Sequence, residues 1–107
     1  MYPIRYINTM FTIQKTDIFD KWLSKLRDTN GKACILARIK RAELGNLGDY
    51  KALGNGLHEM RIDSGPGYRL YFTRFEDKII ILISGGNKSS QSNDIKKAYM
   101  ILKEIGV

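Results

Sequence analysis

Several cationic and phenolic residues fall within one stretch of alternating sequence, residues 57–91. Two segments of alternating apolar and polar residues flank a Gly-Pro-Gly turn there, a pattern typical of a β-hairpin. Because successive strand residues point to opposite faces, Arg61, Arg69 and Tyr71 fall on the face opposite the apolar residues. Lys88 follows shortly after the next, uniformly apolar segment. Two guanidiniums, a phenol and an ammonium converging on one sheet face suit a phosphodiester.

If the phosphodiester is that of RNA, its cleavage without a metal ion requires deprotonation of the 2′-hydroxyl, stabilisation of the phosphorane charge and protonation of the 5′-oxygen. Arg69 is the candidate for charge stabilisation; the alternative is a structural pair with Glu59 or Asp63 on the neighbouring strand. For Arg61 the alternatives are catalysis and an ion pair with Glu59, two residues away on the same face. Tyr71 is either an acid–base or base-stacking residue, or a half-buried tyrosine of the sheet.

Two lysines are candidates for proton transfer, because neighbouring cations lower the pKa of a lysine side chain toward the range of a general base. These are Lys88 and Lys51, and the alternative for both is a solvated loop lysine. His58 has the only side chain with an unperturbed pKa near neutrality. It alternates with Met60 and Ile62, so we expect it in the core or at its rim.

The length and composition of the chain indicate one domain, residues 1–107, and its formal net charge is +7. This charge favours an acidic partner: nucleic acid first, an acidic protein second and a membrane surface third. A single cysteine excludes an intrachain disulfide, and one cysteine with one histidine argue against a structural zinc site. No apolar run approaches a membrane span or a signal peptide, so we expect a soluble, cytoplasmic protein.

The N-terminal half predicts a strand followed by two helices. The strand covers residues 10–15, and residues 1–8 either extend it or form a loose leader. Thr16 or Asp17 offers an N-cap for the first helix. Its inward residues are Phe19, Trp22, Leu23 and Leu26. After a break at residues 28–31, the second helix covers about 32–44. Its inward residues are Ile35, Leu36 and Ile39, and its outer face carries Lys32, Arg38, Lys40 and Arg41. That outer face either contacts the phosphates of a nucleic acid or is simply solvated.

The C-terminal half predicts a loop, three strands and a helix. Residues 45–56 are rich in glycine and asparagine, so we expect an irregular loop that brings Lys51 close to the next strand. The predicted strands cover about 57–63, 68–75 and 78–84, the last being central and covered on both faces. Ser89 or Ser90 caps a final helix whose inward residues are Ile95, Ala98, Tyr99 and Leu102. The order β-α-α-β-β-β-α predicts an α+β domain with a mainly antiparallel sheet, packed by a helical hairpin and a C-terminal helix.

An ordered set of motifs covers nearly the whole chain from about Met10. In sequence order these are Trp22-Leu23 with Leu26, Arg38-Ile39 with Arg41, Gly45-Asn46, Gly48-Asp49 with Lys51, Glu59 with Arg61, Gly65-Pro66-Gly67-Tyr68-Arg69-Leu70-Tyr71, and Gly85-Gly86-Asn87-Lys88-Ser89 with Gln91 and Asp94-Ile95. With this set the chain resembles the RelE/ParE superfamily of type II toxin–antitoxin toxins. The resemblance is to the branch of addiction-module killer proteins, or HigB-like (phage Gp49-like) toxins.

The resemblance implies a small cytoplasmic toxin held inactive by a cognate antitoxin, of helix-turn-helix type in this branch. RelE-like members enter the ribosomal A site and cut messenger RNA, and they keep a phosphate-binding arginine at the position of Arg69. ParE-like members with the same fold inhibit DNA gyrase and cut no RNA, so the fold alone does not choose between them. Some HigB-type toxins use histidines in the site, whereas His58 is the only histidine here.

We therefore expect a ribosome-dependent messenger RNA endonuclease that needs neither cofactor nor metal. Its predicted catalytic residues are Arg69, Arg61, Tyr71 and Lys88, and its predicted RNA- or ribosome-binding residues are Lys51, Arg38, Lys40 and Arg41. The clustering of basic and phenolic residues favours this function. The alternatives are a ParE-like, non-nuclease inhibitor of gyrase and an inactive homologue that only binds its antitoxin.

Overall fold

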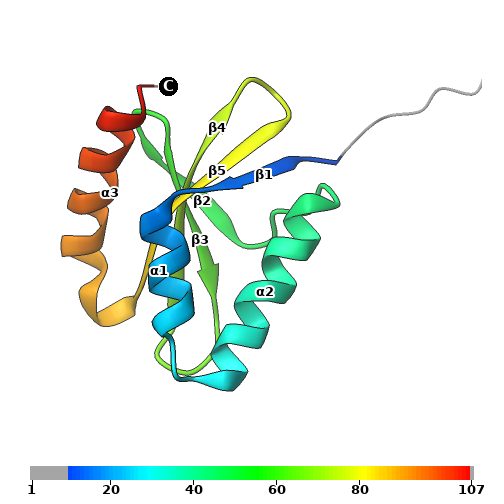
Figure 1. Cartoon of the computed structure of the whole chain (residues 1–107), viewed down its shortest axis with the longest axis vertical. Coiled ribbons are helices and arrows are strands. Elements are labelled where there is room, and N and C mark those ends of the chain that lie inside the picture. Colours follow the sequence, from blue (N-terminus) through cyan, green and yellow to red (C-terminus); the bar gives the residue numbers. More distant parts are fainter. Residues whose placement is uncertain (1–9, 107) are drawn as a thin grey trace, which may run out of the picture.

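One five-stranded sheet carries the site, with the strand order β1-β5-β4-β3-β2. The computed structural model describes residues 10–106, so the predicted segment 1–8 lies outside the described residues. The strands are β1 (Thr12–Lys15), β2 (Tyr50–Gly54), β3 (Leu57–Ile62), β4 (Tyr68–Phe75) and β5 (Ile79–Asn87). β1 runs parallel to β5, and all other neighbours are antiparallel (Figure 1). The prediction of an α+β domain with a mainly antiparallel sheet is confirmed.

The first helix, α1 (Asp17–Lys25), begins where the sequence predicts. The Thr16 side chain caps it, because its Oγ1 accepts a hydrogen bond of 3.0 Å from the backbone N–H of Phe19. Phe19 and Leu23 are buried, and Trp22 is half-buried on the same side. The predicted inward stripe of this helix is therefore confirmed.

The second helix, α2 (Thr29–Glu43), begins three residues before the predicted start. Asp28 does not merely break the chain: its Oδ1 accepts a hydrogen bond of 3.1 Å from the N–H of Gly31 and so caps the helix. Its other oxygen accepts one of 2.8 Å from the Tyr68 hydroxyl, which ties the helical hairpin to β4. The prediction that Leu36 faces inward is wrong, since its side chain is 48% exposed.

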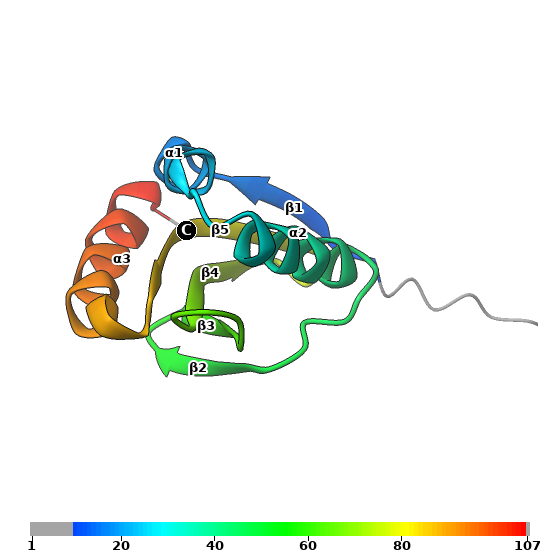
Figure 2. The same ribbon diagram turned by 90° about the horizontal axis from the view of Figure 1, so that it is seen from below.

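Hydrophobic clusters lie on both faces of the sheet. On one face, α1 and α2 pack on β3, β4 and β5 (Figure 2). The fully buried residues there include Phe19, Ile35, Met60 and Phe72. On the other face, α3 (Gln91–Ile105) covers a smaller cluster. Its members are Leu57, Tyr71, Ile83, Ala98 and Leu102. Burial of each large apolar side chain contributes about 1.5–3 kcal/mol, and these two clusters hold the strands in place.

β2 corrects the prediction of an irregular loop over residues 45–56, and the element order is β-α-α-β-β-β-β-α. Asn55 and Gly56 form a two-residue turn between β2 and β3, with φ values of 52° and 85°. Asn-Gly is the residue pair that favours such a turn, because both positions need positive φ. Lys51 therefore lies on a strand, opposite Glu59 of β3, and not on a loop.

β5 continues through Gly85 and Gly86 to Asn87, beyond its predicted end. Both glycines are required by close packing: a Cβ on Gly85 would lie 2.4 Å from the Trp22 ring, and one on Gly86 would collide with Asp94. A 3₁₀ turn, η1 (Lys88–Ser90), then leads into α3. Asn87 caps this turn with its side chain. Ser90, one of the two predicted caps of the final helix, is the N-cap residue of α3, but its side chain makes no capping hydrogen bond. No helix within residues 10–106 is long and apolar enough to cross a membrane.

Candidate functional site

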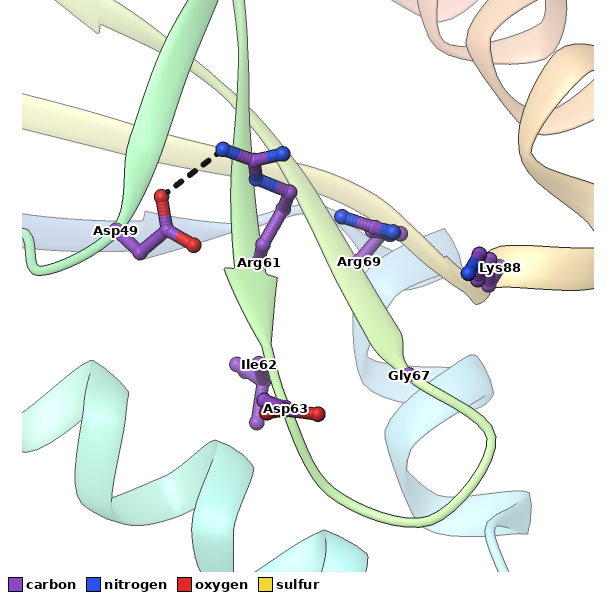
Figure 3. A pocket seen from close by; sticks show the side chains of 7 residues that line it. All are labelled: Asp49, Arg61, Ile62, Asp63, Gly67, Arg69 and Lys88. Atoms are coloured by element: carbon purple, nitrogen blue, oxygen red, sulfur yellow. Dashed lines mark hydrogen bonds and ion pairs between the residues drawn. The ribbon is translucent and has the colours of Figure 1, made fainter.

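An open pocket of about 300 Å³ lies at the turn end of the β3–β4 hairpin (Figure 3). Three of the four predicted catalytic residues line it, and they come from successive elements: Arg61 from β3, Arg69 from β4 and Lys88 from η1. The remaining lining residues are Asp49, Ile62, Asp63 and Gly67. With three cations and two carboxylates, the pocket is cationic and suits an anion.

Arg61 and Arg69 are directly opposite each other in the register of β3 and β4. Two guanidiniums placed in this way repel each other unless anions are close. Asp49 offsets one of them, because its Oδ1 lies 3.1 Å from Nη2 of Arg61. The side chains of this pair are 41% and 62% exposed, and such surface pairs stabilise a fold by at most about 1 kcal/mol. An anionic ligand can therefore compete with Asp49 for Arg61.

Arg69 lies between the pocket and a buried carboxylate. Its side chain is only 13% exposed, and its Nη1 is 3.9 Å from Oε1 of Glu59, which has no exposed surface. Oε2 of Glu59 accepts a hydrogen bond of 2.8 Å from Nε2 of Gln91, at the start of α3. The structural alternative for Arg69, a pair with Glu59, is thus present, and the same side chain lines the pocket.

The backbone fixes the position of Lys88 beside the hairpin turn. Its N–H donates a hydrogen bond of 2.8 Å to the carbonyl of Gly67. Gly67 has a φ of 78°, and a Cβ there would lie 3.5 Å from Cβ of Lys88. The side chain of Lys88 is exposed. The positive φ, and not the packing, favours glycine at position 67, and the backbone bond from Lys88 to this residue brings an ammonium group to the pocket.

The carboxylates of the pocket were not among the predicted site residues. Asp63 shares a strand face with Arg61, two residues away, so alternation alone could have identified it. Asp49 precedes β2 in the chain, and its backbone is bonded to β3. The N–H of Arg61 donates a hydrogen bond of 2.9 Å to the carbonyl of Asp49. No local pattern in the sequence signals that long-range contact.

Tyr71, the fourth predicted catalytic residue, does not line the pocket. It faces the same side of the sheet as Glu59, its register partner on β3, but α3 covers it and leaves no exposed surface. Burial raises the pKa of the Tyr71 phenol above its ordinary value, and the negative charge of Glu59 raises it further. A buried phenol that stays protonated at neutral pH cannot exchange a proton with a substrate in the pocket.

Arg38 is also not where its prediction placed it. It is 9% exposed, and its guanidinium donates hydrogen bonds to three backbone carbonyls. The acceptors are Arg61 at 2.7 Å, Leu47 at 2.9 Å and Asp49 at 3.2 Å. Burial lowers the pKa of this guanidinium, and the nearby charge of Arg41 acts in the same direction. Arg38 therefore cannot contact RNA; it supports the backbone of two residues that line the pocket.

The other predicted RNA-binding residues lie outside the pocket. Lys51 is exposed on β2, and Lys40 and Arg41 are exposed on α2. Nζ of Lys40 is 3.8 Å from a carboxylate oxygen of Glu43. His58 is half-buried and its ring stacks on Phe72, as expected for the rim of the core. Within residues 10–106, no group of three or more His, Cys, Asp or Glu side chains is arranged to hold a metal ion.

Comparison with known proteins identifies one clear relative. A protein of Haemophilus influenzae, described as an uncharacterized protein, is 47% identical over 95 residues, which cover 89% of this chain and 96% of the relative. No protein-family model matches the chain. Identity at this level over nearly the full length of both proteins means that the chain and this Haemophilus influenzae protein belong to one family.

Proposed function

We propose that this protein is a toxin of a type II toxin–antitoxin system, of the HigB-like branch of the RelE/ParE superfamily, that cleaves messenger RNA on the ribosome. The motif resemblance supports the family. The observation that carries the activity is the pocket in which Arg61, Arg69 and Lys88 converge. Phosphate groups are the ligands that such a set of guanidinium and ammonium donors binds best.

In the proposed reaction, the 2′-oxygen of a ribose attacks the adjacent phosphorus and the bond to the 5′-oxygen breaks. Arg69 and Arg61 stabilise the negative charge of the phosphorane. Stabilisation of this developing charge by fixed donors is usually the largest single contribution to the rate. Lys88 is the donor available to protonate the leaving 5′-oxygen. Tyr71 takes no part. Asp63, an exposed carboxylate in the pocket, is the candidate to accept the proton of the 2′-hydroxyl.

Glu59 and Gln91 act on this reaction through Arg69. A buried carboxylate close to a guanidinium restricts its rotamers, so Arg69 is already oriented before the phosphate arrives. Fixed donors stabilise a transition state without a cost of reorganisation. The ribosome would supply the remaining orientation of the substrate, so RNA alone should be cut poorly.

The proposed partners are the ribosome, messenger RNA and a cognate antitoxin. Lys51, Lys40 and Arg41 are exposed, so they are available for RNA phosphates, and this contact should weaken with salt. Arg38, also predicted to bind RNA, is buried and is therefore not proposed to contact it.

One observation favours the ParE-like alternative, a toxin that inhibits DNA gyrase without cutting RNA. Arg69 balances the charge of Glu59, so a structural reason for the arginine exists without catalysis. In that case toxicity should survive any Arg69 substitution that preserves folding.

The test is to induce the protein in a bacterial host and to map the 5′ ends of all transcripts. New ends within translated reading frames support the endonuclease, whereas intact transcripts with broken DNA support gyrase inhibition. Arg74→Ala is the matched control for Arg69→Ala, because Arg74 is an exposed arginine of the same strand outside the phosphate pocket. Loss of cleavage with Arg69→Ala but not with Arg74→Ala is the expected result.

A further inference from the structure

One buried guanidinium joins α2 to both residues of the Asp49–Arg61 ion pair. Nη1 of Arg38 donates a hydrogen bond to the carbonyl of Arg61 on β3. Nη2 donates to the carbonyls of Leu47 and Asp49, in the segment that precedes β2. The two nitrogens thus bond to two different segments of the chain. A planar guanidinium can do this because its donors have fixed, divergent directions, whereas the ammonium of a lysine presents a single nitrogen.

Asp49 lies one residue before β2, where the regular pairing with β3 ends. The last register pair in this direction is Tyr50 opposite Met60. One backbone bond continues beyond it, in which the N–H of Arg61 donates to the carbonyl of Asp49 at 2.9 Å. The same carbonyl also accepts the bond from Arg38, at 3.2 Å. Arg38 therefore reinforces the end of the β2–β3 pairing at the two residues that line the pocket.

The side chains of Asp49 and Arg61 meet because their backbones are held side by side. Figure 3 shows the contact at the pocket, where Oδ1 of Asp49 lies 3.1 Å from Nη2 of Arg61. Both side chains are partly exposed, and an exposed ion pair alone restrains its partners weakly. The point from which Arg61 reaches into the pocket is consequently set by its backbone, to which Arg38 is bonded.

The backbone at residue 48 leaves room for this guanidinium. Gly48 has a φ of 66°, and a Cβ there would lie 2.5 Å from Nη2 of Arg38. Positive φ and close approach both favour glycine at this position. An alanine at position 48 would therefore displace the guanidinium, and Gly48 itself is exposed and does not line the pocket of Arg61.

We propose that Arg38 is a positioning residue of the phosphate site, a role that rests on the proposed function. Its guanidinium holds Arg61 in the arrangement in which Arg61 binds a phosphate group, although Arg38 is only 9% exposed and does not line the pocket. A donor that is already oriented loses less conformational freedom on binding than a mobile one. Loss of the guanidinium should therefore weaken anion binding even in a protein that stays folded.

The test is a titration with inorganic phosphate and with an RNA dinucleotide whose 2′-oxygen is methylated, so that it cannot be cleaved. Binding is followed by the NMR signals of the Nε–H groups of Arg61 and Arg69, whose Nε atoms are buried. Arg38→Lys keeps the charge but loses the planar donor set, and Gly48→Ala displaces the guanidinium from outside. Arg41→Lys is the matched control, because Arg41 is an exposed arginine of the same helix. All titrations are made at a temperature at which circular dichroism shows the variant to be folded.

The dissociation constants of both probes should rise by roughly threefold to tenfold in Arg38→Lys and in Gly48→Ala, the effect of one donor side chain that must be immobilised on binding. Arg41→Lys should bind both probes like the wild type. Without any ligand, the Nε–H signal of Arg61 should shift in the first two variants while that of Arg69 stays in place. A role in stability alone would not produce this selective shift or the loss of affinity in folded protein.

Asp49→Asn distinguishes positioning from competition. It removes the charge that competes with the ligand for Arg61, so it should tighten phosphate binding, by up to roughly fivefold. If Arg38→Lys also bound phosphate more tightly, Arg38 would merely bring a competing carboxylate to Arg61, and the positioning role would be overturned.

Unchanged affinity in folded Arg38→Lys would overturn the positioning role as well. Gly48→Ala decides the question in the same way if Arg38→Lys is too unstable to titrate. In each of these cases the wild type still binds phosphate, so the proposed function stands. If the wild type bound neither probe, the proposed phosphate site would fall, and the role of Arg38 with it.

Discussion

The carboxylate of Glu59 is fully buried beside Arg69, whose Nη1 lies 3.9 Å from Glu59 Oε1. Gln91 donates a hydrogen bond to the other carboxylate oxygen. Arg69 consequently has two roles at once: it balances a buried charge, and it presents donors to the pocket. Any substitution of Arg69 therefore affects stability as well as function, and the two effects must be measured in the same variants.

Arg69→Ala should lower the free energy of unfolding by about 3 kcal/mol, because it leaves Glu59 buried without a counter-charge. If the proposed reaction is right, cleavage should also fall by on the order of a hundredfold, as with the loss of one oxyanion donor. Urea unfolding and mapping of transcript ends at equal amounts of folded protein measure the two effects.

The double variant Glu59→Gln with Arg69→Ala separates these effects. Glutamine keeps the shape of Glu59 and its contact with Gln91 but removes the buried charge. We expect most of the lost stability to return while cleavage stays low. If toxicity returned together with stability, Arg69 would be a structural residue only.

Tyr71→Phe should leave toxicity unchanged, in contrast to substitutions of Arg61 or Lys88. The Tyr71 hydroxyl is buried under α3 beside the carboxylate of Glu59, so its removal should change stability by no more than one such contact contributes, about 1–2 kcal/mol. Growth assays and thermal melts of the three variants provide the comparison. A large loss of toxicity in a stably folded Tyr71→Phe protein would restore a chemical role for the phenol.

Arg38→Ala should destabilise the fold by roughly 2–4 kcal/mol, because three buried carbonyls lose a charged donor. Arg41→Ala, an exposed arginine of the same helix, should change stability by no more than about 0.5 kcal/mol. Chemical denaturation of both variants tests this contrast. If both substitutions lowered the free energy of unfolding by the same small amount, the guanidinium of Arg38 would be in contact with water.

His58 should make the fold less stable as the pH falls from 7.5 to 5. Desolvation lowers the pKa of its imidazole below the ordinary 6.5, and the positive charge of Arg74 lowers it further. The unfolded chain therefore binds a proton first, so the free energy of unfolding decreases as the pH falls through 6.5. The single histidine gives one imidazole NMR signal, from which the pKa can be read directly. His58→Phe keeps the stacking on Phe72 and should remove this part of the pH dependence.

Periodicity predicted most of the secondary structure, but the prediction failed in two places, one of them because of a charged residue. The spacing Ile35, Arg38, Ile39, Ala42 is that of one helix face, and all four residues are buried. Because Arg38 is charged, the prediction placed it outside and turned Leu36 inward. Burial of an arginine depends on backbone carbonyls supplied from distant segments, and a sequence does not reveal them. β2 was missed for a different reason: glycine and asparagine were taken as signs of a loop, although Asn55-Gly56 favours a hairpin.

The sequence predicted which site residues share one face of the sheet, but not which of them are accessible there. Alternation correctly grouped Arg61, Arg69 and Tyr71 on one side of the sheet. It could not show that α3 covers Tyr71 and Glu59 and leaves the turn end of the hairpin open. Which part of a face stays accessible depends on the position of a helix that lies later in the chain, and tertiary packing determines that position.

The parallel pairing of β1 with β5 has a consequence for how the chain folds. Thr16 Oγ1 donates a hydrogen bond to the carbonyl of Ile83, across 67 residues of sequence. The β2–β3 and β3–β4 hairpins join neighbouring segments and close short loops, whereas the β1–β5 pair must close a long one, at a higher cost in chain entropy. During synthesis from the N-terminus, β1 therefore waits without a partner until β5 has been made. Lys88 follows directly after β5, so the sheet and the pocket lined by Arg61, Arg69 and Lys88 become complete at the same stage of synthesis.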